Sequence, residues 1–218
     1  MKYASLEGAE FSQPIGKIVC IGRNYVEHIR ELGNETPQSP VLFIKPTTSV
    51  VYDGGKVVIP GYSKECHHEA ELALLIGKGG SGIAPEDVMT HIAGFGVAID
   101  LTLRDVQAGL KQKGLPWEIA KGFDTACPLS GFTAVEKVPD PHNLRIRLWV
   151  NDELRQDGST ALMIHRIPEM VSYMSGIFTL EAGDIILTGT PAGVGPLFSG
   201  DRVTAEVEQV GRVTVQVI

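Results

Sequence analysis

Two glutamates and an aspartate are the residues of this chain whose types and spacing best suit chemistry. Glu69 and Glu71 lie in the run His67–Ile76, HHEAELALLI, which predicts a strand. Residues two apart on a strand share a face, and adjacent carboxylates repel each other unless a cation lies between them. A third acid, Asp100, ends the apolar run 96–99. Three carboxylates without cysteine suit Mg²⁺ or Mn²⁺; the alternative is a solvated edge strand, with Asp100 as a helix cap.

Two later segments offer groups that can bind an anion. Lys121 is the only charge in the apolar pentad 119–123, so it is either a site lysine or a side chain that reaches out to solvent. Thr190 lies in the loop 187–195, LTGTPAGVG, whose N–H groups and hydroxyl can receive a carboxylate. A Walker loop is excluded, because the Lys-Ser/Thr ending is absent. The alternative is a plain glycine-rich turn.

A predicted helix near the N-terminus carries a possible acid–base pair. It starts at Asn24 as the N-cap, runs to about residue 32 and ends at Gly33. His28 and Glu31 are three residues apart and share a face, so Glu31 can orient the imidazole for proton transfer. The alternative is an exposed polar pair. Glycines on both sides would let the segment close as a lid over a metal site.

The elements that must position these residues are short. Glycine and proline, 25 and 13 residues, are typical of many turns between short strands. Strands are expected at 17–22, 41–44, 57–59, 69–76, 94–100, 146–150, 153–156, 184–187, 203–207 and 212–217. Helices are expected at 24–32, 85–87, 104–113 and 168–176. Helices and strands do not alternate regularly, which excludes Rossmann and TIM architectures and predicts a β-rich α+β fold. We expect residues 1–16 to form an arm and residues 17–218 one domain.

Composition narrows the class of protein. The 218 residues are 43% hydrophobic, enough for a sizeable core. A net charge of −7 gives no general basis for binding nucleic acid or an anionic membrane. Uncharged stretches are too short to cross a bilayer, and the N-terminus lacks a secretory signal. The three cysteines are widely spaced and imply no disulfide framework, so we expect a cytoplasmic protein.

Several motifs occur together in a distinctive order. They are Gly22-Arg23-Asn24-Tyr25, Phe43-Ile44-Lys45-Pro46, His68-Glu69-x-Glu71-Leu72, Asp100-Leu101-Thr102-x-Arg104-Asp105-x-Gln107, Gly114-Leu115-Pro116-Trp117, Lys121-x-Phe123-Asp124, Asn151-x-Glu153-Leu154-Arg155-Gln156 and Thr188-Gly189-Thr190-Pro191-x-Gly193-Val194-Gly195. From about residue 16 to the end, the chain resembles the fumarylacetoacetate hydrolase family, and most closely its short branch of acylpyruvate hydrolases and oxaloacetate decarboxylases.

The resemblance implies a fold, a cofactor and a site. The fold is a mixed β-sandwich roll with a few short helices, usually as a homodimer. Mg²⁺ or Mn²⁺ is implied at Glu69, Glu71 and Asp100, and proton chemistry at His28 and Glu31, on a helix that orders when ligand binds. Lys121 is expected to be catalytic, through a charge-assisted contact to a developing enolate. Contacts to a small 2-oxo acid are implied for Arg23, Arg104, Gln107 and Thr190; from spacing alone, the alternative for Arg104 and Gln107 is an ordinary polar surface.

The expected function is metal-dependent cleavage of a small 2-oxo acid, as an acylpyruvate hydrolase or an oxaloacetate decarboxylase, through a metal-stabilised enolate. The alternative is an isomerase or a keto–enol tautomerase of oxaloacetate or of 2-hydroxyhepta-2,4-diene-1,7-dioate, which moves protons without breaking a carbon–carbon bond. A non-catalytic dicarboxylate-binding module is the third reading, and the intact acids at all three ligand positions argue against it.

Overall fold

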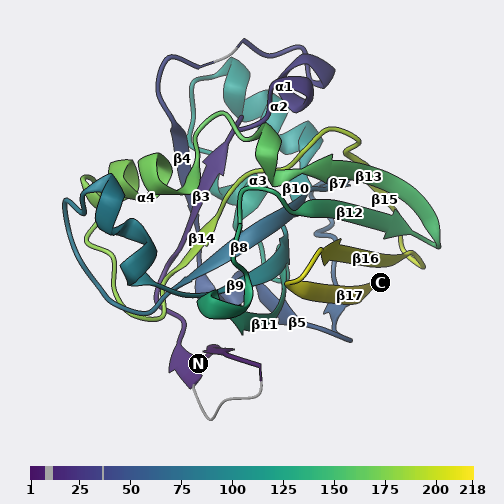
Figure 1. The fold of residues 1–218 in the computed structure, drawn as a ribbon. Coiled ribbons are helices and arrows are strands. Elements are labelled where there is room, and N and C mark those ends of the chain that lie inside the picture. Colours follow the sequence, from purple (N-terminus) through teal and green to yellow (C-terminus); the bar gives the residue numbers. More distant parts are fainter. Residues whose placement is uncertain (8–11, 36) are drawn as a thin grey trace.

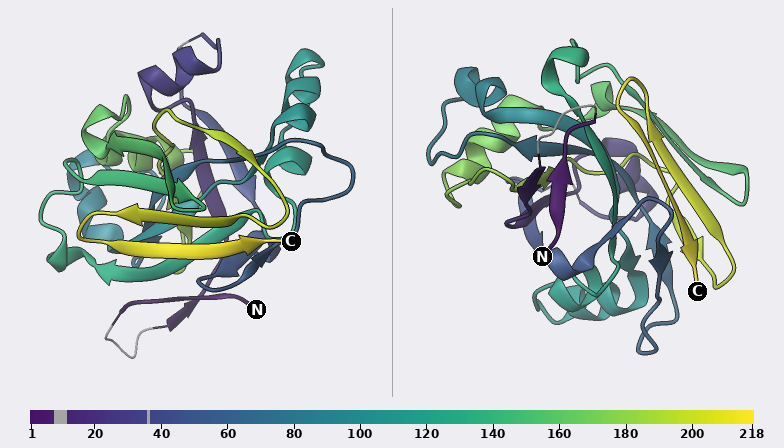
Figure 2. Two further views of the ribbon diagram at one scale, coloured as in Figure 1. Left: turned by 90° about the vertical axis from the view of Figure 1, so that its right-hand side faces the viewer. Right: turned by 90° about the horizontal axis from the view of Figure 1, so that it is seen from below.

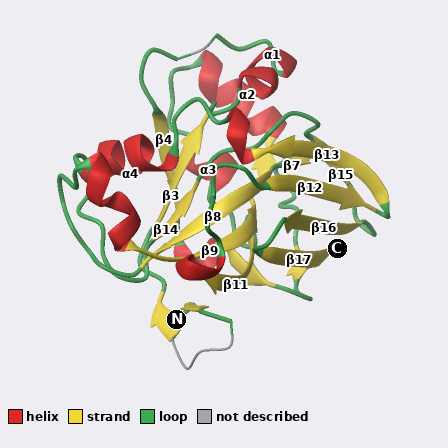
Figure 3. Cartoon of the chain, in the orientation of Figure 1, coloured by secondary structure: helices red, strands yellow, loops and turns green. Residues whose placement is uncertain are grey.

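Strands are the predominant regular secondary structure in the computed structural model, which describes residues 1–7, 12–35 and 37–218 (Figures 1 and 3). The largest sheet has the order β4 (Val41–Lys45), β3 (Ile18–Gly22), β14 (Ile185–Leu187), β8 (Ala70–Ile76), β9 (Ile92–Ile99), β11 (Cys127–Ala134) and β5 (Val50–Tyr52). A second sheet has the order β13 (Glu153–Ser159), β12 (Arg145–Val150), β16 (Arg202–Val207), β17 (Gly211–Val217) and β6 (Lys56–Val57).

Two smaller sheets and the helices complete the described chain. The three-stranded sheet has the order β10 (Thr102–Leu103), β7 (Cys66–His68) and β15 (Gly195–Leu197), and β1 (Tyr3–Ser5) pairs with β2 (Ser12–Pro14). The α-helices are α1 (Val26–Glu31), α2 (Arg104–Gln112), α3 (Glu118–Lys121) and α4 (Ile167–Ser175). Short 3-10 helices span Thr47–Ser49, Pro85–His91, Val135–Lys137 and Thr160–Leu162.

The main core lies between the two large sheets. The second sheet packs across β8, β9 and β11, where alternate residues of each strand point inward. Leu72 and Leu74 of β8 belong to this core, while Ala73 and Leu75 belong to a second cluster on the opposite face of the same strand. Because both faces of β8 are covered, all seven of its residues are buried.

The predicted fold class is confirmed. Most strand pairs are antiparallel, but β3 with β14, β5 with β11 and β6 with β17 are parallel, so the sheets are mixed. The two large sheets form a curled sandwich, with the helices at its periphery (Figures 1 and 3). In the described part of the chain, no helix is both long enough and apolar enough to cross a membrane.

Several boundaries differ from the sequence prediction. The strand predicted at 57–59 is only Lys56–Val57, and the one predicted at 69–76 begins at Ala70. Residues 8–11 of the predicted arm lie outside the described residues; the described part of the arm pairs β1 with β2, and its Ala4 and Ile15 are buried in the second cluster.

The predicted cap of the first helix is wrong. Tyr25 is the N-cap of α1 and makes no side-chain cap hydrogen bond. The Asn24 side chain instead donates to the Thr188 carbonyl at 2.8 Å and accepts from the His165 backbone N–H at 2.8 Å. Gly189, at φ +90°, packs so closely that a Cβ there would lie 2.8 Å from Asn24 Cβ. The Asn24 side-chain amide therefore bonds to residues distant in the sequence instead of capping the helix that follows it.

Candidate active site

One cavity is lined by nine of the ten predicted site residues. They are Arg23, His28, Glu69, Glu71, Asp100, Arg104, Gln107, Lys121 and Thr190. The tenth, Glu31, contacts His28. Helices α1 and α2 both contribute to the lining, and they stand at the same end of the fold (Figure 2).

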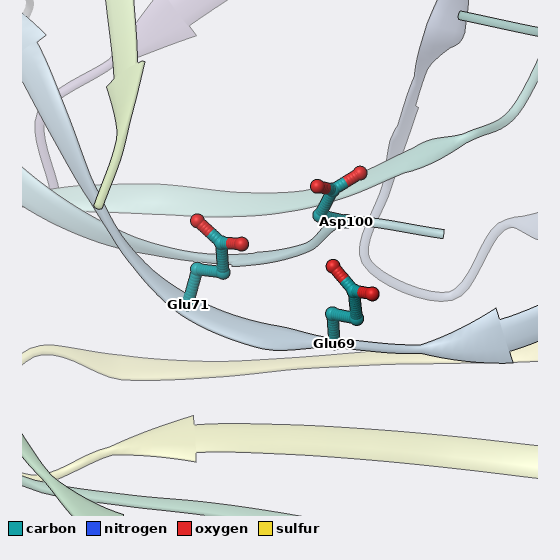
Figure 4. Close-up of side chains that lie close together, drawn as sticks. All are labelled: Glu69, Glu71 and Asp100. Atoms are coloured by element: carbon teal, nitrogen blue, oxygen red, sulfur yellow. The ribbon is translucent and has the colours of Figure 1, made fainter. Parts of the chain in front are cut away.

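The carboxylates come together where two neighbouring strands change sheets. Glu69 is the residue between β7 and β8, and Asp100 follows β9 just before β10, so each acid sits where the chain passes from the small sheet to the large one or back. The Asp100 N–H donates to the Glu69 carbonyl at 2.8 Å and joins the two bends. Glu69 and Glu71 share a face as predicted, toward the segment that carries Asp100 (Figure 4). One oxygen from each acid lies within 4.8 Å of the others, and all three residues are buried.

Buried cations hold two of the three acids. Lys121 Nζ donates to Glu69 Oε2 at 2.8 Å and to Asp100 Oδ2 at 2.6 Å. Arg104 also pairs with Glu69, through Oε1. Burial works to raise the pKa of Glu69, but Lys121 and Arg104 outweigh it and hold that pKa well below its usual range. The alternative, in which the Lys121 side chain reaches out to solvent, is thereby excluded, since Lys121 is 3% exposed.

A further lysine, which sequence reasoning left without a role, lies behind the acids. Lys45 Nζ is 2.7 Å from Asp100 Oδ1 and is fully buried. Its N–H groups donate to backbone carbonyls, those of Leu101, Lys121 and Ala126. Asp100 Oδ1 therefore faces a positive charge but accepts no hydrogen bond. Lys45 belongs to the quoted motif Phe43-Ile44-Lys45-Pro46, which was the available signal.

Glu71 differs from its two neighbours, because no cation pairs with it among the described residues. Its Oε2 accepts the Gly189 N–H at 2.6 Å. Burial, followed by the charges of Asp100 and Glu69, raises the pKa of Glu71 well above its usual range. A buried carboxylate in that position is stabilised by a cation at the centre of the three acids. An all-oxygen donor set, with a buried Asp100 oxygen that accepts no hydrogen bond, fits a hard divalent ion such as Mg²⁺ or Mn²⁺.

The predicted acid–base pair forms on α1, and one of its members is buried. His28 Nδ1 lies 3.4 Å from Glu31 Oε2, and the His28 side chain is 8% exposed, so the pair is not an ordinary surface contact. Glu31 Oε1 also accepts the Gly193 N–H at 3.0 Å, which ties the helix to the glycine loop. Burial lowers the pKa of His28, although Glu69 and Glu31 act in the opposite direction. His28 is therefore neutral at neutral pH and can accept a proton.

The glycine loop is fixed by a residue that sequence reasoning left without a role, Gln156 of β13. Its Nε2 donates to Thr190 Oγ1 at 2.8 Å and to the Pro191 carbonyl at 2.9 Å. Its Oε1 accepts the Ala70 N–H at 3.0 Å and faces His68 Nδ1 at 3.1 Å. Because Thr190 Oγ1 already accepts from Gln156, its own proton remains free to be donated into the cavity. Gln156 ends a quoted motif, but nothing in its spacing shows these partners.

Helix α2 presents three polar residues to the cavity. Arg104 donates to Gln107 Oε1 at 2.7 Å, and both line the cavity, so they are not an ordinary polar surface. Lys111 lines the same cavity and was not predicted. Its spacing was the available signal, since residues 104, 107 and 111 lie on one helical face.

Comparison with known proteins places this geometry in a family. Residues 17–218 match the fumarylacetoacetate (FAA) hydrolase C-terminal family. The chain is 53% identical over 199 residues to the oxaloacetate tautomerase YcgM of Escherichia coli (strain K12), covering 91% of each protein. It is 50% identical over 193 residues to the mitochondrial oxaloacetate tautomerase of Bos taurus, covering 88% of this chain and 87% of that protein.

Solved structures of related enzymes have the same fold as this chain. The fumarylpyruvate hydrolase of Pseudomonas aeruginosa, in complex with Mn²⁺ and pyruvate, has a TM-score of 0.95 at 34% identity over 100% of this chain and 95% of that one. The 5-carboxymethyl-2-hydroxymuconate delta-isomerase of Mycobacterium smegmatis has a TM-score of 0.84 at 34% identity over 96% and 86%. The relatives are thus hydrolases, tautomerases and isomerases. The predicted resemblance is confirmed, and the chain belongs to the fumarylacetoacetate hydrolase family of enzymes.

Proposed function

We propose that this chain is a divalent-metal-dependent tautomerase that interconverts the keto and enol forms of oxaloacetate. The observation that carries the proposal is one cavity joining the carboxylates Glu69, Glu71 and Asp100 with the His28–Glu31 pair. Relatives that share about half of the residues are named oxaloacetate tautomerases, which favours the reaction that the sequence analysis placed second. Keto–enol exchange moves one proton between carbon and oxygen, so a base and a stabilised negative charge suffice.

The three buried carboxylates are the proposed metal ligands. Their oxygen-only donor set and the raised pKa of Glu71 support a divalent cation between them. When bound, the ion supplies a Lewis acid that stabilises negative charge on the 2-oxo oxygen. Mg²⁺ is the first choice and Mn²⁺ the second; Mn²⁺ is present in the related fumarylpyruvate hydrolase.

His28 is the proposed base. Its Nε2 takes a proton from the methylene carbon beside the 2-oxo group. The electron pair of that C–H bond forms the carbon–carbon double bond, while the π pair of the carbonyl group moves onto its oxygen. Glu31 faces Nδ1 and stabilises the imidazolium that results. The enol oxygen takes its proton from water, and the His28 imidazolium returns its proton to the hydroxide that is left. Lys121 is not the donor, because Glu69 and Asp100 bind its ammonium too tightly for it to release a proton.

The remaining predicted residues are proposed to bind and orient the substrate. Lys121 uses two N–H groups on carboxylates, which leaves one for the developing enolate oxygen. Thr190 offers its hydroxyl proton to a substrate carboxylate. Arg104, Gln107 and Arg23 line the same cavity.

The test follows enol absorbance and pyruvate release together. Protein treated with EDTA is mixed with oxaloacetate, with and without added Mg²⁺ or Mn²⁺. We expect metal to accelerate the exchange without a matching release of pyruvate, and His28→Ala to abolish the acceleration while metal binding survives. Unchanged exchange rates with metal present, or full activity in His28→Ala, would contradict the proposal.

Carbon–carbon cleavage is the second candidate, as the sequence analysis expected. It is supported by the 34% identical fumarylpyruvate hydrolase, which covers the whole chain, and by a histidine–glutamate pair that can also activate water. In the same assay, metal-dependent pyruvate release from acetylpyruvate or oxaloacetate at the rate of enol exchange would favour cleavage.

Two expectations about the protein's surroundings stay predictions. We expect a homodimer, and the molar mass in solution, measured by light scattering, tests this. A cytoplasmic location is consistent with the reduced cysteines, Cys20, Cys66 and Cys127, which are all buried. Named relatives include both a bacterial protein and mitochondrial ones.

A further inference from the structure

Lys111 of helix α2 lines the cavity but has no role in the proposed chemistry. Arg104 and Gln107 interact with each other, and Arg104 also pairs with Glu69. Lys111, one turn further along, has no carboxylate partner anywhere in residues 1–7, 12–35 and 37–218. Its Nζ instead lies 5.3 Å from the centre of the Trp117 ring, which also lines the cavity.

Arg23 brings a second cation without an anion to the same cavity. Its guanidinium donates to the neutral amide oxygen of Asn34 at 3.3 Å, and its Nε is buried with no hydrogen-bond partner. In the described part of the chain it forms no ion pair. The backbone of Arg23 adopts φ +61°, a left-handed conformation that is uncommon outside glycine. The surrounding structure thus holds the Arg23 backbone in a conformation that is unfavourable for a residue other than glycine.

Among the residues that the structure describes, Arg23 and Lys111 lack an ion-pair partner that would balance their own charge. Burial, then the charges of Arg23, Arg104 and Lys121, lower the pKa of Lys111 to about 8. Arg104 and Lys121 have carboxylate partners, so their charges are balanced, whereas those of Arg23 and Lys111 are not. Like charges that share a partly buried cavity repel each other, and an anion between them relieves the repulsion.

We propose that Arg23 and Lys111 bind the second carboxylate of a four-carbon 2-oxo dicarboxylate and select it over acylpyruvates whose far end is uncharged. The proposal rests on the proposed function for the position of the first carboxylate, near the acidic cluster. It makes Lys111 a specificity residue: its ammonium contacts the distal carboxylate and takes no part in moving the proton.

Binding of two 2-hydroxy acids tests the subsite without any turnover. Malate carries the second carboxylate and lactate lacks it, and both are titrated calorimetrically into the protein with Mg²⁺. We expect the wild type to bind malate more tightly than lactate. Lys111→Met should weaken malate binding by about 10- to 100-fold, the usual effect of a hydrogen bond to a charged group, and leave lactate binding unchanged.

Two further variants control for charge and for folding. Lys113→Met removes an exposed lysine two residues along that does not line the cavity, so malate affinity should not change. Lys111→Arg keeps the charge and should retain the preference for malate. In the tautomerase assay, Lys111→Met should lower kcat/KM for oxaloacetate by the same factor as malate affinity.

The outcomes separate this proposal from the function on which it rests. A wild type that binds malate no more tightly than lactate, or a Lys111→Met variant that loses both ligands equally or neither, overturns the subsite. A wild type that prefers malate through Lys111 but does not accelerate oxaloacetate exchange overturns only the proposed function.

Discussion

At the scale of single residues, Glu69 and Glu71 show how neighbours decide what one side chain type does. They share a face two residues apart, and both are buried. Lys121 and Arg104 keep Glu69 ionised. At Glu71, burial and the charges of Asp100 and Glu69 outweigh Lys121 and the Gly189 N–H, so its pKa moves the other way. Glu71 is accordingly the acid whose charge depends most on a metal ion.

Replacing Glu71 separates metal binding from folding. Glu71→Gln removes an oxygen anion from the proposed ligand set, and we expect the affinity for Mg²⁺ or Mn²⁺ to fall by at least about 100-fold. The melting temperature of the metal-free protein should not fall, since the change also removes repulsion with Asp100. Calorimetric Mn²⁺ titration and thermal unfolding in EDTA measure both. Unchanged metal affinity would show that Glu71 is not a ligand.

The His28–Glu31 pair predicts a pH dependence with a definite sign. Glu31 raises the pKa of His28, so Glu31→Gln should lower that pKa. Activity that needs neutral His28 rises with pH through this pKa, and its acidic limb should therefore move to lower pH in the variant. The kcat/KM profile against pH measures the shift.

A neighbouring glutamate on the same helix serves as the control. Glu27 is exposed, and its ion-pair partner among the described residues is Arg30, so Glu27→Gln should leave the acidic limb in place. If Glu31→Gln also leaves it unchanged, Glu31 does not act through His28.

At the scale of elements, the site exists because two strand pairs bend at the same place. The large sheet pairs β8 with β9, the small sheet pairs β7 with β10, and Glu69 and Asp100 occupy the two bends. Gln156 of β13 then holds the first bend through the Ala70 N–H, and the glycine loop through Thr190. One buried amide thus sets the distance between the acidic cluster and the loop.

The role of Gln156 is tested by a change of one atom. Gln156→Glu loses both N–H donors and places an oxygen against the Pro191 carbonyl, which should destabilise the fold by about 1–3 kcal/mol. The Thr190 hydroxyl should turn to the new carboxylate, so KM should rise more than kcat falls.

Gln216 provides a matched control, because its amide also donates to two carbonyls, those of Gly200 and Asp201, but does not line the cavity. Gln216→Glu should leave KM unchanged. A Gln156→Glu variant with the KM of the wild type would show that Gln156 does not position Thr190.

At the scale of the whole molecule, the packing of the two large sheets holds β8, the strand that carries Glu71. Leu72 of β8 points into the core between the two large sheets. Successive residues of β8 alternate between that core and the second buried cluster on the opposite face. Glu71 lies on β8, whose seven residues are all buried, and Glu69 directly precedes that strand, so metal binding should be coupled to global stability.

Metal should raise the melting temperature of the whole chain. An ion that binds only the folded state at 100 times its Kd stabilises that state by about 2.7 kcal/mol. Thermal unfolding in EDTA and in Mg²⁺ measures the effect, which should vanish in Glu71→Gln. It should persist in Glu206→Gln, because Glu206 is a half-buried acid of β16 that pairs with Arg147 away from the cavity. Equal melting temperatures with and without metal in the wild type would contradict a metal centre in these carboxylates.

Local patterns in the sequence determined the elements and several site residues. Strand periodicity placed Glu69 and Glu71 on one face, helical periodicity joined His28 to Glu31 and Arg104 to Gln107, and these relations hold because they depend only on neighbours along the chain. The order of the motifs also indicated the family, and with it the mixed sheets.

Tertiary structure alone decided which of these residues meet and in what state of charge. Lys45, Gln156 and Lys111 looked like ordinary strand or helix residues, because their partners lie in segments far away along the chain. The amide of Asn24, predicted as a local cap, bonds instead to residues more than a hundred positions away. Sheet order brings such segments together, and burial then sets the pKa of each group, so neither can be read from spacing.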